Sequence, residues 1–155
     1  MKSRRCRLPE GRYLEHRTFA RVRFQEVDSL GIVWHGHYLT YFEDARVAFG
    51  RHYGIDYTDI LQAGIAAPIV HVSCDYLSPA RYGEQLEVAA MLFHRDSATL
   101  EFHYAISRPA DAVVLAVGSS IQAFADLQGQ LILVLPEFMR RFYQRWEHLM
   151  VENHG

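Results

Sequence analysis

Three side chains able to do acid–base or metal chemistry lie within one short stretch, VDSLGIVWHGHY, residues 27–38. Asp28 comes near its start, and His35 and His37 follow after a break at Gly31. A carboxylate and two imidazoles so close together can bind a metal ion, transfer protons, or belong to the entry of an ordinary helix. The elements around the stretch must decide among these three possibilities.

A metal site is disfavoured, because a metal ion needs three or four ligands in one compact shell. At the start of a helix, residues two apart such as His35 and His37 diverge by about 200°. Asp28 would have to complete the shell across a loop, and no downstream His or Cys pair has metal-binding spacing. A serine or cysteine nucleophile is disfavoured too, since Cys74 has no evident base and no G-x-S-x-G motif is present. We therefore expect neither a metal nor a cofactor.

A long, mostly buried helix is predicted to follow, from about Gly36 to Gly54. Its apolar side chains recur at steps of three and four, as Tyr38, Phe42, Ala45, Phe49 and Tyr53. Exposed amide groups at a helix start form a partial positive end, which can stabilise an oxygen as it becomes negative. Asp28 can then attack a carbonyl held there or activate water against it. An aspartate in a loop before a helix is also commonly structural, so geometry alone leaves its role open.

The remaining chain predicts strands and one terminal helix. Alternating apolar residues predict strands over 19–25, 68–78, 85–94, about 100–106 and 131–135. Residues 112–126 are apolar at both odd and even positions, which is typical of a central strand covered on both faces. Pro136 is suited to open a last helix. We expect an N-terminal extension over residues 1–18 and a single α+β domain over 19–150, with one long helix against an antiparallel sheet.

Size and charge exclude several classes of protein. The chain has 155 residues, half of them hydrophobic, which suits one domain with a substantial core. Its net charge of −2 implies no nucleic-acid-binding face, and the basic residues 2–7 are expected to form a solvated tail. No apolar run approaches the roughly 18 residues of a membrane span, and no signal peptide is evident. A cytoplasmic, soluble protein is the expectation.

A family resemblance gives the stretch a more definite interpretation. The pattern Asp28-x-x-Gly31-x-Val33-x-His35-x-x-Tyr38, followed by Phe42-Glu43-x-Ala45-Arg46, resembles the signature of the 4-hydroxybenzoyl-CoA thioesterase family. It is most similar to the branch of small bacterial acyl-CoA thioesterases associated with the Tol–Pal system, over about residues 21–136. The resemblance implies the hotdog fold, in which a sheet wraps a long central helix, and metal-free hydrolysis of acyl-CoA thioesters.

Residue roles follow from that resemblance position by position. Asp28 matches the catalytic carboxylate. His35 matches the helix-entry residue whose backbone N–H polarises the thioester carbonyl, with its imidazole as a further possible participant. Arg95 corresponds to a basic segment that contacts CoA phosphates, although this chain is less basic there. The positions expected to contact substrate are Gly31, Val33, Trp34, Gly36, Tyr38 and Arg95.

The fold leaves two other functions open. The same fold hosts hotdog dehydratases, and the other alternative is a non-catalytic protein that binds acyl-CoA or acyl carrier protein. Trp34, Tyr38 and Tyr41 suit an aromatic or an aliphatic acyl group equally well. An acyl carrier protein is also open as the natural carrier. Since one helix covers only one sheet face and edge strands invite pairing, we expect a homodimer or homotetramer whose sites draw on two chains.

Overall fold

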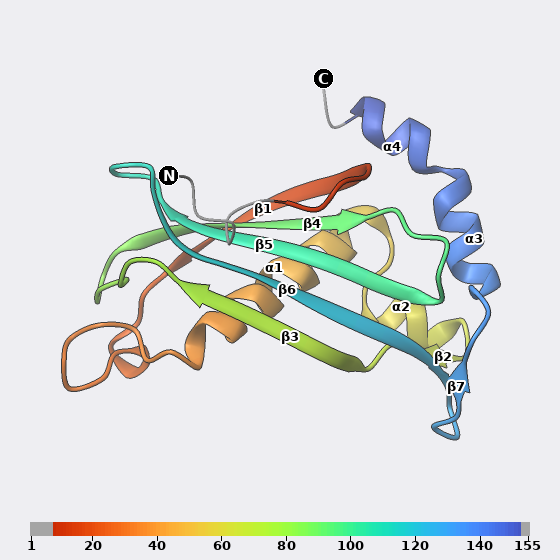
Figure 1. Cartoon of the computed structure of the whole chain (residues 1–155), viewed down its shortest axis with the longest axis horizontal. Helices are drawn as coiled ribbons and strands as arrows, with labels where there is room; N and C mark the ends of the chain where they lie inside the picture. Colours follow the sequence, from red (N-terminus) through yellow and green to blue (C-terminus); the bar gives the residue numbers. More distant parts are fainter. Residues whose placement is uncertain (1–7, 153–155) are drawn as a thin grey trace.

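The sheet and its long helix form the body of the molecule. The computed structural model describes residues 8–152, so the basic cluster at residues 2–7 lies outside the described residues. A seven-stranded antiparallel sheet curves around helix α1 (His37–Tyr53) (Figure 1). The other elements are β1 (Tyr13–Arg21), η2 (Phe24–Glu26), α2 (Tyr57–Gln62), β2 (Ile65–Ala66), β3 (Ile69–Tyr76), β4 (Gln85–Phe93), β5 (Thr99–Arg108), β6 (Val113–Asp126), β7 (Leu131–Ile132), α3 (Glu137–Gln144) and α4 (Trp146–Glu152). No described helix combines the length and apolarity needed to cross a bilayer.

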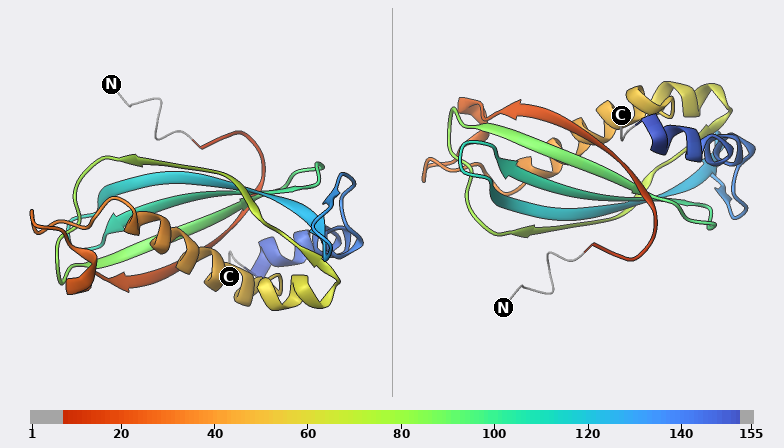
Figure 2. Two further views of the ribbon diagram at one scale, coloured as in Figure 1. Left: turned by 90° about the horizontal axis from the view of Figure 1, so that it is seen from below. Right: turned by 90° about the horizontal axis from the view of Figure 1, so that it is seen from above.

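The strand order determines which edges stay open. The path β1-β4-β5-β6 forms the centre of the sheet, and β3 pairs with the other side of β6. The short strands β2 and β7 extend the far end of β6. Helix α1 lies against one face of the sheet, and the opposite face carries no helix in the described chain (Figure 2). Strands β1 and β3 therefore each present one edge without a partner strand among residues 8–152.

The core forms between α1 and the inner face of the sheet, as the alternating patterns predicted. On β4 and β5 the inward positions are buried: Leu86, Val88, Ala90, Leu92, Leu100, Phe102, Tyr104 and Ile106. The ring of Phe42 on α1 stacks on that of Tyr104, with centroids 4.6 Å apart. Helix α1 ends at Gly54, whose φ of 76° is the left-handed conformation that glycine adopts readily. The predicted helix is confirmed to within a residue at each end.

Five predicted elements need correction, and one of them is the strand predicted over 131–135, of which only Leu131–Ile132 (β7) is a strand. The first strand begins at Tyr13 rather than residue 19, because backbone pairing with β4 extends along a polar segment. Residues 24–26 form the short 3-10 helix η2 instead of continuing that strand. The outer face of β6 is half-exposed rather than covered, since no layer packs there. The last helix breaks at Arg145 into α3 and α4, and the segment after Gly54, expected to be a plain connection, contains α2.

Candidate active site

Asp28 lies in a tight loop between η2 and α1, drawn in orange at the lower left of Figure 1. Its side-chain Oδ1 accepts a hydrogen bond from the Leu30 amide at 2.8 Å. Its carbonyl accepts from the Gly31 amide at 3.0 Å, and Gly31 has a φ of 75° that favours glycine. Within the described chain no donor bonds the second carboxylate oxygen, Oδ2. Asp28 therefore holds its own loop with one oxygen and keeps the other available for chemistry.

The entry of α1 presents backbone donors beside this carboxylate. Gly36 is the N-cap residue, and no side chain caps the helix there. The amide of Trp34 donates to the Glu26 carbonyl and that of His37 donates to the Trp34 carbonyl. Among residues 8–152, the amides of His35 and Gly36 donate to no protein acceptor. Unpaired amides at a helix start can bind an oxygen that becomes negative.

A pocket of about 300 Å³ connects these two features. Its walls come from three segments: the Asp28 loop, the start of α1 with His35 and Tyr38, and the end of β3 with Tyr76. The Tyr76 hydroxyl donates to the His35 carbonyl at 2.8 Å, and the Tyr38 and Tyr76 rings meet edge to face at 5.2 Å. Partial burial raises the pKa of Tyr76 to about 12, so its hydroxyl stays a donor at neutral pH. Tyr76 thereby orients the peptide that begins the helix.

The structure brings together only part of the expected set. Asp28, Val33, His35 and Tyr38 all line the pocket. Gly31 and Gly36 shape the backbone around it, whereas the half-exposed Trp34 lies outside, between the rings of His35 and His37 at 4.7 and 5.5 Å.

Arg95 is placed far from Asp28 in the same chain, at the opposite end of the sheet. It pairs with Glu101 at 2.8 Å and its guanidinium lies over the Phe93 ring. Its expected contact with CoA phosphates stays a prediction, and within this pocket Arg95 makes no contribution.

Two residues that support the Asp28 pocket were not predicted from the sequence, Glu26 and Tyr76. Glu26 is a buried carboxylate, and its Oε1 accepts from the Arg23 amide at 2.8 Å and from the Tyr41 hydroxyl at 3.0 Å. Tyr41 is buried, supports the Asp28 loop through Glu26, and does not line the Asp28 pocket. In the sequence Glu26 is a carboxylate two residues before Asp28, and Tyr76 is a tyrosine near the end of a predicted strand. Neither position indicates a hydrogen-bond partner that is distant in sequence.

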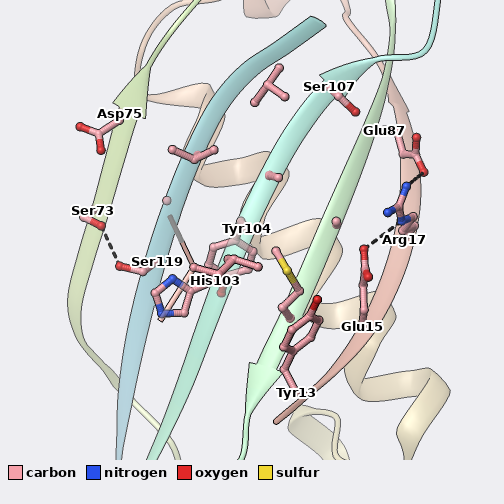
Figure 3. Close-up of a pocket in the computed structure, with 17 residues that line it drawn as sticks. Tyr13, Glu15, Arg17, Ser73, Asp75, Glu87, His103, Tyr104, Ser107 and Ser119 are labelled. Carbon is pink, nitrogen blue, oxygen red and sulfur yellow. Dashed lines mark hydrogen bonds and ion pairs between the residues drawn. The ribbon is translucent and has the colours of Figure 1, made fainter. Parts of the chain in front are cut away.

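A larger depression of about 530 Å³ crosses the outer face of the sheet (Figure 3). Its polar groups are largely paired with one another: Ser73 with Ser119 at 2.7 Å, and Arg17 with Glu15 and Glu87 at 2.9 and 3.0 Å. His103 lies on β5 there, and burial lowers its pKa. The depression holds neither Asp28 nor a helix start, so it lacks the combination found at the 300 Å³ pocket.

The chain is similar in sequence to known thioesterases. Residues 22–142 match the thioesterase-like superfamily. A putative acyl-CoA thioesterase of Bacillus subtilis, YneP, is 31% identical over 99 residues, which cover 64% of this chain and 72% of that protein. The acyl-CoA thioester hydrolase YbgC of Escherichia coli is 26% identical over 82 residues, covering 53% of this chain and 61% of the hydrolase. Membership of the Tol–Pal branch stays a prediction.

A solved structure supports the fold assignment. The 1,4-dihydroxy-2-naphthoyl-CoA thioesterase of Synechocystis superposes with a TM-score of 0.76 at 21% identity, covering 86% of this chain and 98% of that one. At that identity the likeness concerns the fold, which is the predicted α+β hotdog fold. Since the family match extends over 22–142, well over half the chain, this protein belongs to the thioesterase-like superfamily.

Proposed function

We propose that this protein hydrolyses the thioester of an acyl-CoA to a free acid and CoA at the Asp28 pocket. The observation that carries the proposal is a pocket lined by both Asp28 and His35: Oδ2 of Asp28 has no donor among residues 8–152, and the amides of His35 and the next residue, Gly36, have no acceptor there. The thioester carbonyl oxygen would lie at those amides, which stabilise it as the tetrahedral intermediate forms. Asp28 would attack the carbonyl carbon or take a proton from the attacking water.

Replacing Asp28 by Asn tests this directly. Asparagine keeps an Oδ1 acceptor for the Leu30 amide, so the loop should keep its shape while the negative charge is lost. We expect turnover of an acyl-CoA panel, followed with a free-thiol reagent, to fall by about 10²–10⁴. Asp96→Asn, an exposed aspartate in the β4–β5 turn, is the matched control. Near-normal turnover of a folded Asp28→Asn protein would show that Asp28 does not carry the chemistry.

His35→Ala separates a backbone role from an imidazole role. Alanine keeps the amide and the helix start, so a backbone contribution predicts only a modest loss of activity. An imidazole contribution, in which the ring would donate to the carbonyl or orient water, predicts a large loss of activity in the variant. We favour the backbone role. A loss of 100-fold or more would contradict it.

We also propose that the working unit is a homodimer, or a tetramer of two such pairs, joined through β3. Strand β3 has an open edge and exposes Ile69, Val70, Val72 and Tyr76. The Asp28 pocket lies at the end of β3, and a mainly apolar pocket of about 450 Å³ lies at its beginning, lined by Val47 and Ile69 among others. The two are separated by seven residue steps, about 23 Å. Antiparallel pairing of two β3 strands would bring the Asp28 pocket of one copy beside the larger pocket of its partner, where the acyl group can lie.

Mixing two inactive variants tests the shared site. Val47→Trp should block the larger pocket, and Asp28→Asn removes the carboxylate. If sites are shared, random pairing makes half of the dimers mixed, each with one intact site, so about a quarter of the activity should return. No recovery after demonstrated chain exchange, or an active species with the sedimentation of one chain, would contradict the proposal.

A further inference from the structure

A second groove lies on the other side of the α1 entry from the Asp28 pocket. It has a volume of about 880 Å³ and runs along the open edge of β1, past η2, to the first turns of α1. Its walls include Arg21 and Arg23, the aromatic rings of Phe19, Phe24 and Tyr82, and His37. His37 lines this groove and His35, two residues earlier, lines the Asp28 pocket, so both sites include residues of the α1 entry.

The groove carries guanidinium groups that lack carboxylate partners. Arg21 donates to the Gly83 carbonyl at 2.8 Å, and within residues 8–152 neither it nor Arg23 forms an ion pair. By contrast, Arg17 on the same strand pairs with two carboxylates.

The groove also contains two acidic side chains, Glu26 and Asp44, and the positive charge of Arg23 acts on Asp44. Glu26 is already bonded to Tyr41 and to the Arg23 amide. Asp44 is the other carboxylate in the wall, and burial, together with the neighbouring Glu43 and Glu26, raises its pKa. Within residues 8–152 neither carboxylate forms an ion pair with Arg21 or Arg23, so both guanidinium groups keep donors that can bind an anion.

The same groove exposes three aromatic rings. Phe24, Tyr82 and Phe19 are 78%, 62% and 61% exposed, and the first two meet edge to face at 5.9 Å. Exposed apolar side chains in a cluster commonly mark a binding site. Aromatic rings beside arginines bind a flat nucleobase by stacking while the cations bind its phosphates.

From this juxtaposition we infer that the groove binds the 3′-phosphorylated ADP part of CoA, an inference that rests on the proposed thioesterase function. The base stacks against Phe24 and Tyr82, and the phosphates lie at Arg21 and Arg23. The flexible pantetheine arm then passes the α1 entry and delivers the thioester to Asp28. This location differs from Arg95, which lies at the opposite end of the same chain's sheet and is paired with Glu101.

Two substrates with the same acyl group test the inference. One is the acyl-CoA, and the other is the acyl thioester of N-acetylcysteamine, which has the reacting group but no nucleotide. In the double variant Arg21→Gln/Arg23→Gln we expect KM for acyl-CoA to rise about 10–100-fold, as for lost hydrogen bonds to charged groups. The loss should be confined to acyl-CoA, and Phe24→Ala should act in the same direction. Arg141→Gln, an exposed arginine on α3, is the matched control.

Direct binding separates the possible outcomes. Adenosine 3′,5′-bisphosphate should bind the parent protein in calorimetry, compete with acyl-CoA, and bind the double variant at least 10-fold more weakly. Equal effects of the double variant on both thioesters would overturn the inference. It would also be overturned if the KM for acyl-CoA were unchanged in the double variant but raised in Arg95→Gln. Hydrolysis of acyl carrier protein thioesters without bisphosphate binding would overturn it as well. The thioesterase function itself fails only if the parent protein hydrolyses neither thioester, and intact hydrolysis by Asp28→Asn would overturn only the role of Asp28.

Discussion

Glu26 supports the Asp28 loop, and the effect of replacing it can be predicted quantitatively. Its Oε1 accepts hydrogen bonds from the Tyr41 hydroxyl and the Arg23 amide. Tyr41 is only 2% exposed, so in Glu26→Ala its hydroxyl cannot turn to water. A buried donor left without an acceptor costs about 1–3 kcal/mol, and the half-buried Arg23 amide adds a smaller cost. We therefore expect Glu26→Ala to lower the free energy of unfolding by about 2–4 kcal/mol.

Tyr41→Phe provides the second arm of a double-mutant cycle. Burial and the Glu26 carboxylate raise the pKa of Tyr41, so its hydroxyl donates throughout the neutral range. Phenylalanine removes the hydroxyl and leaves the Arg23 bond to Glu26, which should cost about 1–2 kcal/mol. In the double variant no tyrosine donor is left unpaired, so the combined cost should fall short of the sum by about 1–2 kcal/mol.

The assay is urea unfolding of the four proteins, with turnover measured under native conditions. Because Glu26 lies two residues before Asp28 and its carbonyl binds the Trp34 amide, folded Glu26→Ala should lose kcat more than it changes KM. Costs that add to within about 0.5 kcal/mol would refute the coupling between Glu26 and Tyr41.

Two further predictions concern packing and pH. Gly118→Ala should destabilise the fold by about 1–3 kcal/mol, since a Cβ there would lie 2.4 Å from both the Ser73 carbonyl oxygen and the Phe42 ring. The control Ser119→Ala, measured in the same urea titrations, should change the free energy of unfolding little. An unchanged free energy of unfolding in Gly118→Ala would refute the close packing. For His103, burial lowers the folded-state pKa below 6.5, so the unfolded chain binds more protons and stability falls as pH drops below about 6.5. His103→Gln should lessen the drop in melting temperature between pH 7.5 and 5.5, and an unchanged drop would contradict this assignment.

Periodic segments were predictable from the sequence because burial on one face imposes a pattern. Strand β4 alternates Leu86, Val88, Ala90 and Leu92, and all four are buried. The first half of β1 has no such pattern, because its position is set by backbone pairing of Tyr13 with Phe93 rather than by apolar side chains. The break at Arg145 was hidden because Phe142 and Trp146 keep helical spacing across it while both rings stay buried.

The candidate site also contains residues that could be predicted from the sequence and residues that could not. Asp28 and His35 were found because the loop and the helix entry are adjacent in sequence. Tyr76 bonds His35 across 41 residues, and Glu26 bonds Tyr41 across 15, so only the folded chain reveals these supports. Sequence patterns thus located the groups proposed for chemistry, and the tertiary structure was needed to find the groups that hold them in place.

The hydrogen bonds of the Asp28 loop give its carboxylate a structural role and also suit the chemistry proposed for it. The Asp28 amide bonds the Ile32 carbonyl, the Val33 amide bonds the Ala80 carbonyl, and the Trp34 amide bonds the Glu26 carbonyl, each at 2.9 Å. These three bonds fasten the loop at both ends, and Oδ1 of Asp28 fastens its middle. Within the described chain, this leaves Oδ2 and the His35 and Gly36 amides without protein partners. An acceptor and donors that are fixed in place but unpaired are what a site needs to stabilise charge without reorganising during the reaction.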